Sequence, residues 1–169
     1  NTRTGVNTEI PKANVKTVAS SGGDYSTVKG AIDSITEGQK YLIKVKNGTY
    51  TESAITITST SDSATTTHIV IVGETEDGVI IQGGSTFASG KTVSLITTAP
   101  DAENKLFFGV RNITFRYCKY AILGNYLIPS INGRGKMLIY NCHFKYCGFD
   151  GTESTAKTSS EQQVQVSSG

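Results

Sequence analysis

Two segments about 29 residues apart decide the fold: Val110-Arg-Asn-Ile-Thr-Phe-Arg-Tyr-Cys118 and Ile139-Tyr-Asn-Cys-His-Phe-Lys-Tyr-Cys147. Both carry Asn, Phe, Tyr and Cys at the same positions, and Arg116 of the first segment is matched by Lys145 of the second. A repeat of this length, built from alternating apolar residues, indicates one coil of a stacked β-solenoid. Equivalent residues of stacked coils lie about 4.8 Å apart. The repeat therefore predicts ladders of Asn, Phe and Cys along the solenoid axis.

The rest of the pattern is one of short strands, with a single helix near the start. Four apolar residues between positions 28 and 35 fall on one helical face, so we expect an amphipathic helix over residues 25–36, capped by Asp24 or Ser26. From there to residue 149 apolar residues alternate with period two, and Gly, Asn and Asp mark the corners. Such strands fit a sandwich or a solenoid, and the repeat favours the solenoid. The helix would cover the open sheet edge of the first coil.

We expect three parts along the chain: a polar arm over residues 1–14, a β-helix domain over residues 15–151 and a polar tail over residues 152–169. The first residue is Asn1 and not Met, which predicts a mature product or an excised fragment. In the tail, Gln162, Val164 and Val166 belong to an alternating stretch that predicts a terminal strand. We expect this strand and the solenoid ends to make contacts between subunits, giving a homo-oligomer or a polymer.

Composition and charge exclude several classes of function. The net charge is only +2 and the basic residues are scattered, which leaves no electrostatic footprint for nucleic acid. No apolar stretch approaches the roughly 20 residues that span a bilayer. A Thr- and Ser-rich chain with 18% charged residues is typical of extracellular β proteins, so we expect an extracellular, cell-surface or phage-particle location. Cys118 and Cys147 are predicted to stack, either as a disulfide or as buried free thiols.

Several segments resemble a known family. The segment Val18-Ala-Ser-Ser-Gly-Gly-Asp-Tyr-Ser-Thr-Val-Lys-Gly-Ala-Ile-Asp33 is similar to the opening of pectin methylesterases and other pectin-lyase-like proteins. The segments Tyr41-Leu-Ile-Lys-Val-Lys-Asn-Gly-Thr-Tyr50 and Ile69-Val-Ile-Val-Gly-Glu74 resemble the family's first and second coils. The resemblance implies an all-β fold, a single-stranded right-handed parallel β-helix with one N-terminal capping helix. The same opening is found in phage tailspikes and surface adhesins.

Pectin methylesterases use two aspartates, one of them in an Asp-Phe-Ile-Phe-Gly segment, together with two glutamines and an arginine. That segment is absent here, and Gln162 and Gln163 lie in the polar tail, so we predict no catalytic residue. Two acidic turns, around Glu74 and around Asp150, could supply oxygen ligands to Ca²⁺, but solvated corners explain both. His68 and His143 lack zinc spacing. We therefore expect neither a metal site nor a cofactor.

Five residues near the repeat are candidates for binding. Arg111, Arg116 and Lys145 could form a basic rung for an acidic sugar or a subunit, while solubility alone would also account for them. Tyr117 and Tyr146 are predicted either to face outward as a stacking platform for sugar rings or to lie half-buried in strands. The sequence favours a non-catalytic surface module for self-assembly or adhesion. The alternative is a carbohydrate-active module, either a polysaccharide lyase or esterase fragment or a sugar-binding domain.

Overall fold

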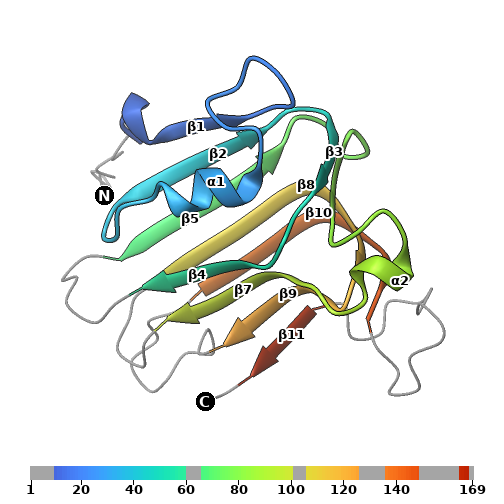
Figure 1. Cartoon of the computed structure of the whole chain (residues 1–169). Helices are drawn as coiled ribbons and strands as arrows, with labels where there is room; N and C mark the ends of the chain where they lie inside the picture. The colour runs from blue at the N-terminus through green and yellow to red at the C-terminus, as the bar shows by residue number, and fades with distance from the viewer. Residues whose placement is uncertain (1–9, 60–65, 101–105, 126–135, 149–163, 168–169) are drawn as a thin grey trace, which may run out of the picture.

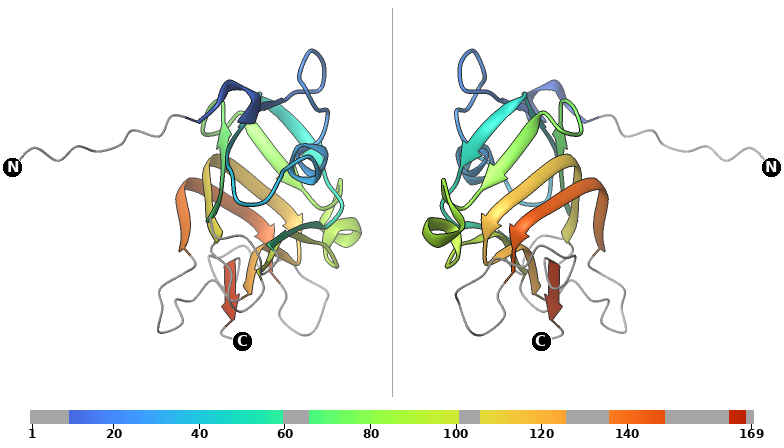
Figure 2. Two further views of the ribbon diagram at one scale, coloured as in Figure 1. Left: turned by 90° about the vertical axis from the view of Figure 1, so that its left-hand side faces the viewer. Right: turned by 90° about the vertical axis from the view of Figure 1, so that its right-hand side faces the viewer.

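The chain forms a parallel β-helix in the computed structural model, which describes residues 10–59, 66–100, 106–125, 136–148 and 164–167. Every strand pairing between these residues is parallel. The strands of successive coils lie one below another, with β1 at the top of the stack and β10 and β11 at the bottom (Figure 1, Figure 2). The all-β fold class expected from the sequence is confirmed.

Each coil passes through three faces. The first face consists of β1 (Val15–Val18), β2 (Lys40–Val45), β5 (Thr67–Gly73) and the first parts of β8 (Leu106–Cys118) and β10 (Lys136–Cys147). The second face consists of β3 (Gly48–Thr51), β6 (Val79–Gln82) and the second parts of β8 and β10. The third face consists of β4 (Ile55–Ser59), β7 (Ser94–Pro100), β9 (Tyr120–Asn125) and β11 (Val164–Ser167).

The two repeated segments of the sequence lie on adjacent strands of the structure. β10 pairs with β8 in the register that the repeat predicts, with Ile139 opposite Val110 and Cys147 opposite Cys118. The predicted ladders are present: the rings of Phe115 and Phe144 stack with centroids 5.5 Å apart. The side-chain amide of Asn141 donates to the side-chain oxygen of Asn112 at 3.0 Å. Matching sequences thus stack residue upon residue.

Two corners bend β8 and β10 at the same repeat positions. Asn112 (φ 56°) and Asn141 (φ 52°) form the corner between the first and second faces, and Tyr117 (φ 51°) and Tyr146 (φ 54°) end the second face. The left-handed region of backbone space suits Asn but is strained for a bulky residue. Gly73 lies against the Asn112 corner, and Gly90 lies against the Tyr117 corner. A Cβ at position 73 would lie 1.9 Å from the carbonyl oxygen of Asn112, and a Cβ at position 90 would lie 1.8 Å from that of Tyr117. The two corners of β8 therefore depend on glycines of the preceding coil.

Alternating side chains fill the interior of the helix. Ile43, Ile71, Val110 and Phe115 are buried and belong to one continuous core. The last rung differs: Met137, Ile139, Cys142 and Phe144 of β10 are only partly buried, and Leu138 and Tyr140 are more than half exposed. Within the described part of the chain, no strand pairs with the far edge of β10. Among the described residues, the first two faces therefore end on a strand whose inward apolar side chains are only partly buried.

The opposite end is covered by a helix, as expected. The helix α1 (Val28–Asp33) contacts β1 and β4 and lies above β4 in Figure 1. It contributes Val28, Ala31 and Ile32 to the core. It is shorter than the range expected from the sequence, and the predicted caps are wrong. Thr27 caps the helix, because its side-chain oxygen accepts the backbone N–H of Gly30. The one-turn helix η1 (Lys12–Asn14) precedes β1.

A second short helix, α2 (Phe87–Gly90), was not expected. It begins with a reciprocal cap in which Thr86 and Ser89 exchange side-chain and backbone hydrogen bonds. With only four residues it carries no apolar periodicity that sequence reasoning could detect. The helix lies in the corner between β6 and β7 and lengthens the second coil.

Candidate functional site

A column of four polar side chains crosses the second face. The strand register places Thr51 of β3, Gln82 of β6, Arg116 of β8 and Lys145 of β10 next to one another on successive strands. The Nε–H of Arg116 donates to the side-chain oxygen of Gln82 at 2.7 Å, and the Gln82 amide donates to the Thr51 hydroxyl at 2.8 Å. Gln82 is 5% exposed, so its amide is a fixed link between the two neighbours. This chain of bonds orients the Arg116 guanidinium.

Two stacked tyrosines stand directly after the two basic residues. The rings of Tyr117 and Tyr146 lie 5.5 Å apart at an interplanar angle of 26°. The guanidinium of Arg116 lies 5.1 Å from the centroid of the Tyr117 ring, within the range of a cation–π contact. Tyr146 is 45% exposed, so the ladder presents aromatic surface to solvent. The structure thus brings together four of the five predicted binding residues, which we call the Arg–Tyr ladder: Arg116, Lys145, Tyr117 and Tyr146.

The fifth predicted residue, Arg111, lies elsewhere. It precedes the Asn112 corner and is therefore on the first face, where its guanidinium lies 5.2 Å from the centroid of the Tyr140 ring. The expectation of a single basic rung from Arg111, Arg116 and Lys145 does not fit this arrangement, because the backbone turns between Arg111 and Arg116.

The acidic residues of the turn between β5 and β6 do not converge. Glu74 accepts hydrogen bonds from Lys46 at 2.7 Å and from the backbone N–H of Asn47 at 3.0 Å. These bonds hold the pKa of Glu74 below its ordinary value. Glu76 instead contacts Nε2 of His143 at 3.1 Å, and hydrogen bonds from His143 and Asn141 lower the pKa of Glu76. Among the described residues, no three His, Cys, Asp or Glu side chains form a group that could hold a metal ion.

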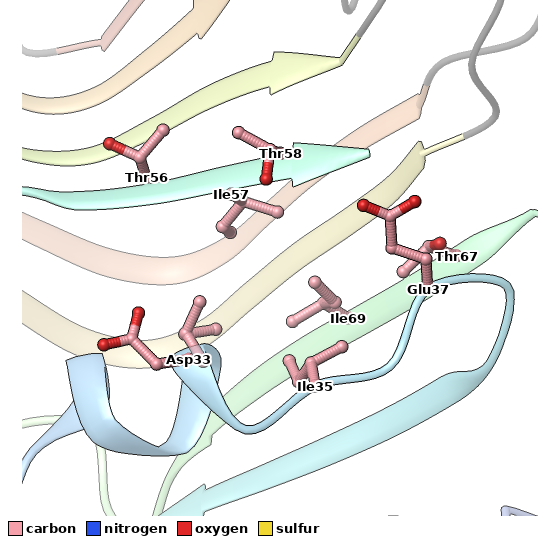
Figure 3. A pocket seen from close by; sticks show the side chains of 9 residues that line it. Asp33, Ile35, Glu37, Thr56, Ile57, Thr58, Thr67 and Ile69 are labelled. Atoms are coloured by element: carbon pink, nitrogen blue, oxygen red, sulfur yellow. The ribbon is translucent and has the colours of Figure 1, made fainter. Parts of the chain in front are cut away.

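A small cleft lies at the capped end of the stack, between α1 and β4 (Figure 3). Ile35, Ile57 and Ile69 form its apolar floor, while Asp33 and Glu37 lie at its rim. Its volume of about 250 Å³ is below the range of most small-molecule sites. Asp33 is already paired with Lys29 at 2.7 Å. The cleft is therefore a weaker candidate than the Arg–Tyr ladder.

Sequence reasoning missed Thr51 and Gln82. Gln82 lies 34 residues before Arg116, and Thr51 lies 31 residues before Gln82. Neither interval equals the 29-residue spacing of Arg116 and Lys145, because α2 and other corners change the coil length. Only the strand register could identify these neighbours.

A buried carboxylate was also missed. Glu52 is 3% exposed and accepts the backbone N–H groups of Val28 at 2.6 Å and Lys29 at 3.3 Å, at the start of α1. Burial raises the pKa of Glu52 above its ordinary value, although the two hydrogen bonds oppose the shift. Glu52 therefore joins the first coil to its capping helix.

Some expectations fall outside the described residues. Gln162 and Asp150 are among them, and β11 is described for its backbone but not for the side chains of Val164 and Val166. The terminal strand expected there is present as β11, which pairs with β9 of the same chain. The contacts between subunits that were expected of this tail stay a prediction.

The comparison with known families decides the membership of the chain. The model of the family described as pectinesterase matches residues 14–155. The chain belongs to the pectinesterase family. This pectinesterase-family chain is thereby grouped with carbohydrate-active modules, which supports the alternative function from the sequence over self-assembly or adhesion. No curated protein gives a significant match, and no described helix is long and apolar enough to span a membrane.

Proposed function

We propose that this pectinesterase-family chain binds an acidic polysaccharide of the pectic type along the Arg–Tyr ladder. The observation that carries the proposal is the in-register pairing of Arg116 with Lys145 beside the stacked rings of Tyr117 and Tyr146. Uronic acid units offer a carboxylate and an apolar ring face. A cation and an aromatic ring on each of two successive coils complement both features.

The orientation of Arg116 favours carboxylate binding. Its bond to Gln82 uses one of the five N–H donors of the guanidinium, whose planar fork matches a carboxylate in two-point geometry. Gln82 is itself fixed by Thr51, so little side-chain freedom is lost when a ligand binds. Lys145 adds a second positive charge on the adjacent strand.

Backbone strain at the tyrosines supports the same function. Tyr117 and Tyr146 both occupy the left-handed region, where a bulky residue costs about 1–3 kcal/mol. Asn or Gly at these corners would avoid that cost. A strained residue that recurs on two coils, and whose side chains form a stack, is consistent with a functional need for the rings.

Calorimetric titration with polygalacturonate, which is fully de-esterified pectin, tests the proposal. We expect Arg116→Gln to weaken binding at least tenfold, because Gln82 holds its guanidinium ready for a two-point bond to a carboxylate. Lys145→Gln should weaken binding less, because an ammonium group binds a carboxylate as a point charge. Lys44→Gln removes the same charge from an exposed position on the first face and serves as the control. Equal losses for all three variants would show a non-specific charge effect and overturn the proposal.

Methyl-esterified pectin separates binding from catalysis. A binding module should retain the polymer without releasing methanol, and binding should weaken as the carboxylates are esterified, because each ester removes a negative charge. If the wild type releases methanol and Arg116→Gln does not, the ladder is part of an esterase site and the proposal of a binding module is wrong.

An outward apolar patch on β10 favours a second proposal, association of two copies. Leu138 and Tyr140 alternate with Met137 and Ile139, which pack on the core, so they face outward from the first face, where they are 54% and 58% exposed. The partner for this patch would be the same patch on a second copy, because a two-fold contact buries the apolar side chains of both. Sedimentation at increasing concentration should give a dimer in the wild type and a monomer in Leu138→Lys; a wild-type monomer at all concentrations would exclude association.

A further inference from the structure

Two cysteines of the repeat face each other inside the stack. Cys118 and Cys147 are paired residues of β8 and β10, and both are fully buried. The Sγ atoms lie 3.1 Å apart, with the thiol of Cys118 donating to that of Cys147, and both are free thiols. Cys142, the third cysteine, lies opposite Ile113 and is only partly buried. One pair of sulfurs is therefore singled out by its geometry.

We propose that Cys118 and Cys147 are a covalent modification site, at which a disulfide joins the last two described coils on oxidation. Paired residues of adjacent strands have Cα atoms about 4.8 Å apart, which lies within the range that disulfides span. The sulfurs need to approach by only about 1 Å to bond. β10 ends at Cys147, and the backbone N–H of the next residue, Gly148, donates to the carbonyl oxygens of Cys118 at 3.1 Å and Lys119 at 3.0 Å, so the backbone already holds the two cysteines side by side.

The reaction balances with a small-molecule disulfide such as oxidised glutathione as the oxidant. One cysteine thiolate attacks the glutathione disulfide and releases one glutathione thiolate. The second cysteine thiolate then attacks the mixed disulfide and releases the other. The two protein thiols lose two protons and two electrons in total, and the glutathione disulfide is reduced to two thiols. The product carries one Cys118–Cys147 bond.

The environment of the pair sets the conditions for the reaction. The hydrogen bond to Cys147, together with burial, raises the pKa of Cys118 above its ordinary value, so the thiolate is scarce in the folded chain. Burial also hinders access by the oxidant. We therefore expect slow oxidation of the folded protein and faster oxidation when mild denaturant opens the β10 coil, since most apolar residues of β10 are only partly buried.

Peptide mapping by mass spectrometry tests the site on the unmodified sequence. The reduced protein is incubated with oxidised glutathione in mild urea, alkylated and digested. We expect a linked pair of peptides containing Cys118 and Cys147, lighter by two hydrogen atoms than their sum, with Cys142 alkylated. Three free thiols after prolonged incubation, or a link that contains Cys142, would overturn the proposal.

A Cys142→Ser variant provides the matched control. It should oxidise to the same product as the wild type, and its urea midpoint should rise on oxidation, because the bond closes a loop of the unfolded chain. Cys147→Ser should show no rise. A rise in Cys147→Ser, or none in Cys142→Ser, would contradict the assignment, and the mapping of the wild type decides the matter if Cys147→Ser fails to fold.

Discussion

The two copies of the repeat have nearly the same backbone and very different surroundings. Asn112 and Tyr117 of the first copy and Asn141 and Tyr146 of the second all have a left-handed φ between 51° and 56°. Phe115 of the first copy is fully buried, whereas Phe144 of the second is only partly buried. The difference teaches that local sequence sets the shape of a coil, while position in the stack sets how much that coil stabilises the protein.

The largest expected difference between the copies concerns their phenylalanines. Phe115→Ala should lower the free energy of unfolding by about 4 kcal/mol, because it empties a site enclosed by coils on both sides. Phe144→Ala should lower it by only about 1–2 kcal/mol, since less area leaves water on folding. Urea unfolding of both variants measures the gap. Equal losses would mean that Phe144 is enclosed in solution as fully as Phe115.

A substitution at Gly73, in the preceding coil, should disturb the Asn112 corner of the first copy. A Cβ at position 73 would meet the carbonyl oxygen of Asn112 at 1.9 Å, and because that oxygen is backbone it cannot move aside. Gly73→Ala should therefore lower the free energy of unfolding by about 3 kcal/mol. Gly109→Ala is the control, because its Cβ would make ordinary contacts at 3.6 Å or more. A Gly73→Ala protein as stable as this control would show that the corner is flexible.

At the end of the stack next to α1, the buried Glu52 holds the start of the helix in place. Glu52→Ala should lower the free energy of unfolding by about 2 kcal/mol, because it leaves the N–H of Val28 buried without its acceptor. A loss that is no greater than that of an exposed substitution would show that α1 holds its place without Glu52. Thermal unfolding at neutral pH makes this measurement.

The pH dependence of stability tests the same carboxylate. Since the pKa of Glu52 is higher in the folded than in the unfolded chain, the folded state binds more protons between the two pKa values. The part of its contribution to stability that depends on protonation is therefore fully present below the unfolded pKa and falls as pH rises through the raised folded pKa. We expect urea midpoints of Glu52→Gln to lack this decline above pH 4.5, the ordinary value. If the urea midpoint of Glu52→Gln declines over the same pH range, the decline comes from an ionisable group other than Glu52.

The smallest effect should come from the exposed corner of the second copy. Asn141→Ala should cost about 1 kcal/mol, because Ala fits the left-handed region poorly and the bond to Asn112 is lost. Asn141→Gly should cost less, since Gly accepts that conformation without strain. Urea midpoints of the two variants give the order, and a more stable Ala variant would show that the backbone conformation matters little here.

The sequence allowed the repeat, the capping helix and the Asn, Phe and Cys ladders to be predicted, because they depend on local pattern and on a constant spacing. The polar column was only half predicted: Arg116 and Lys145 follow the repeat, but Gln82 follows a different interval because α2 lengthens its coil. Arg111 was grouped with Arg116 because the sequence gives no sign that Asn112 turns the backbone between them. Position along a chain does not reveal which face a residue joins when corners vary in length.

The central claim is that the Arg–Tyr ladder binds the acidic polysaccharide. The most direct test is a titration of the ¹⁵N-labelled protein with short polygalacturonate oligomers, followed by NMR. The account predicts that the Nε–H signal of Arg116 and the backbone amide signals of Tyr117 and Tyr146 shift together and saturate. Shifts confined to the third face, around Thr56 and Thr97, with the Arg116 signal unmoved, would contradict it.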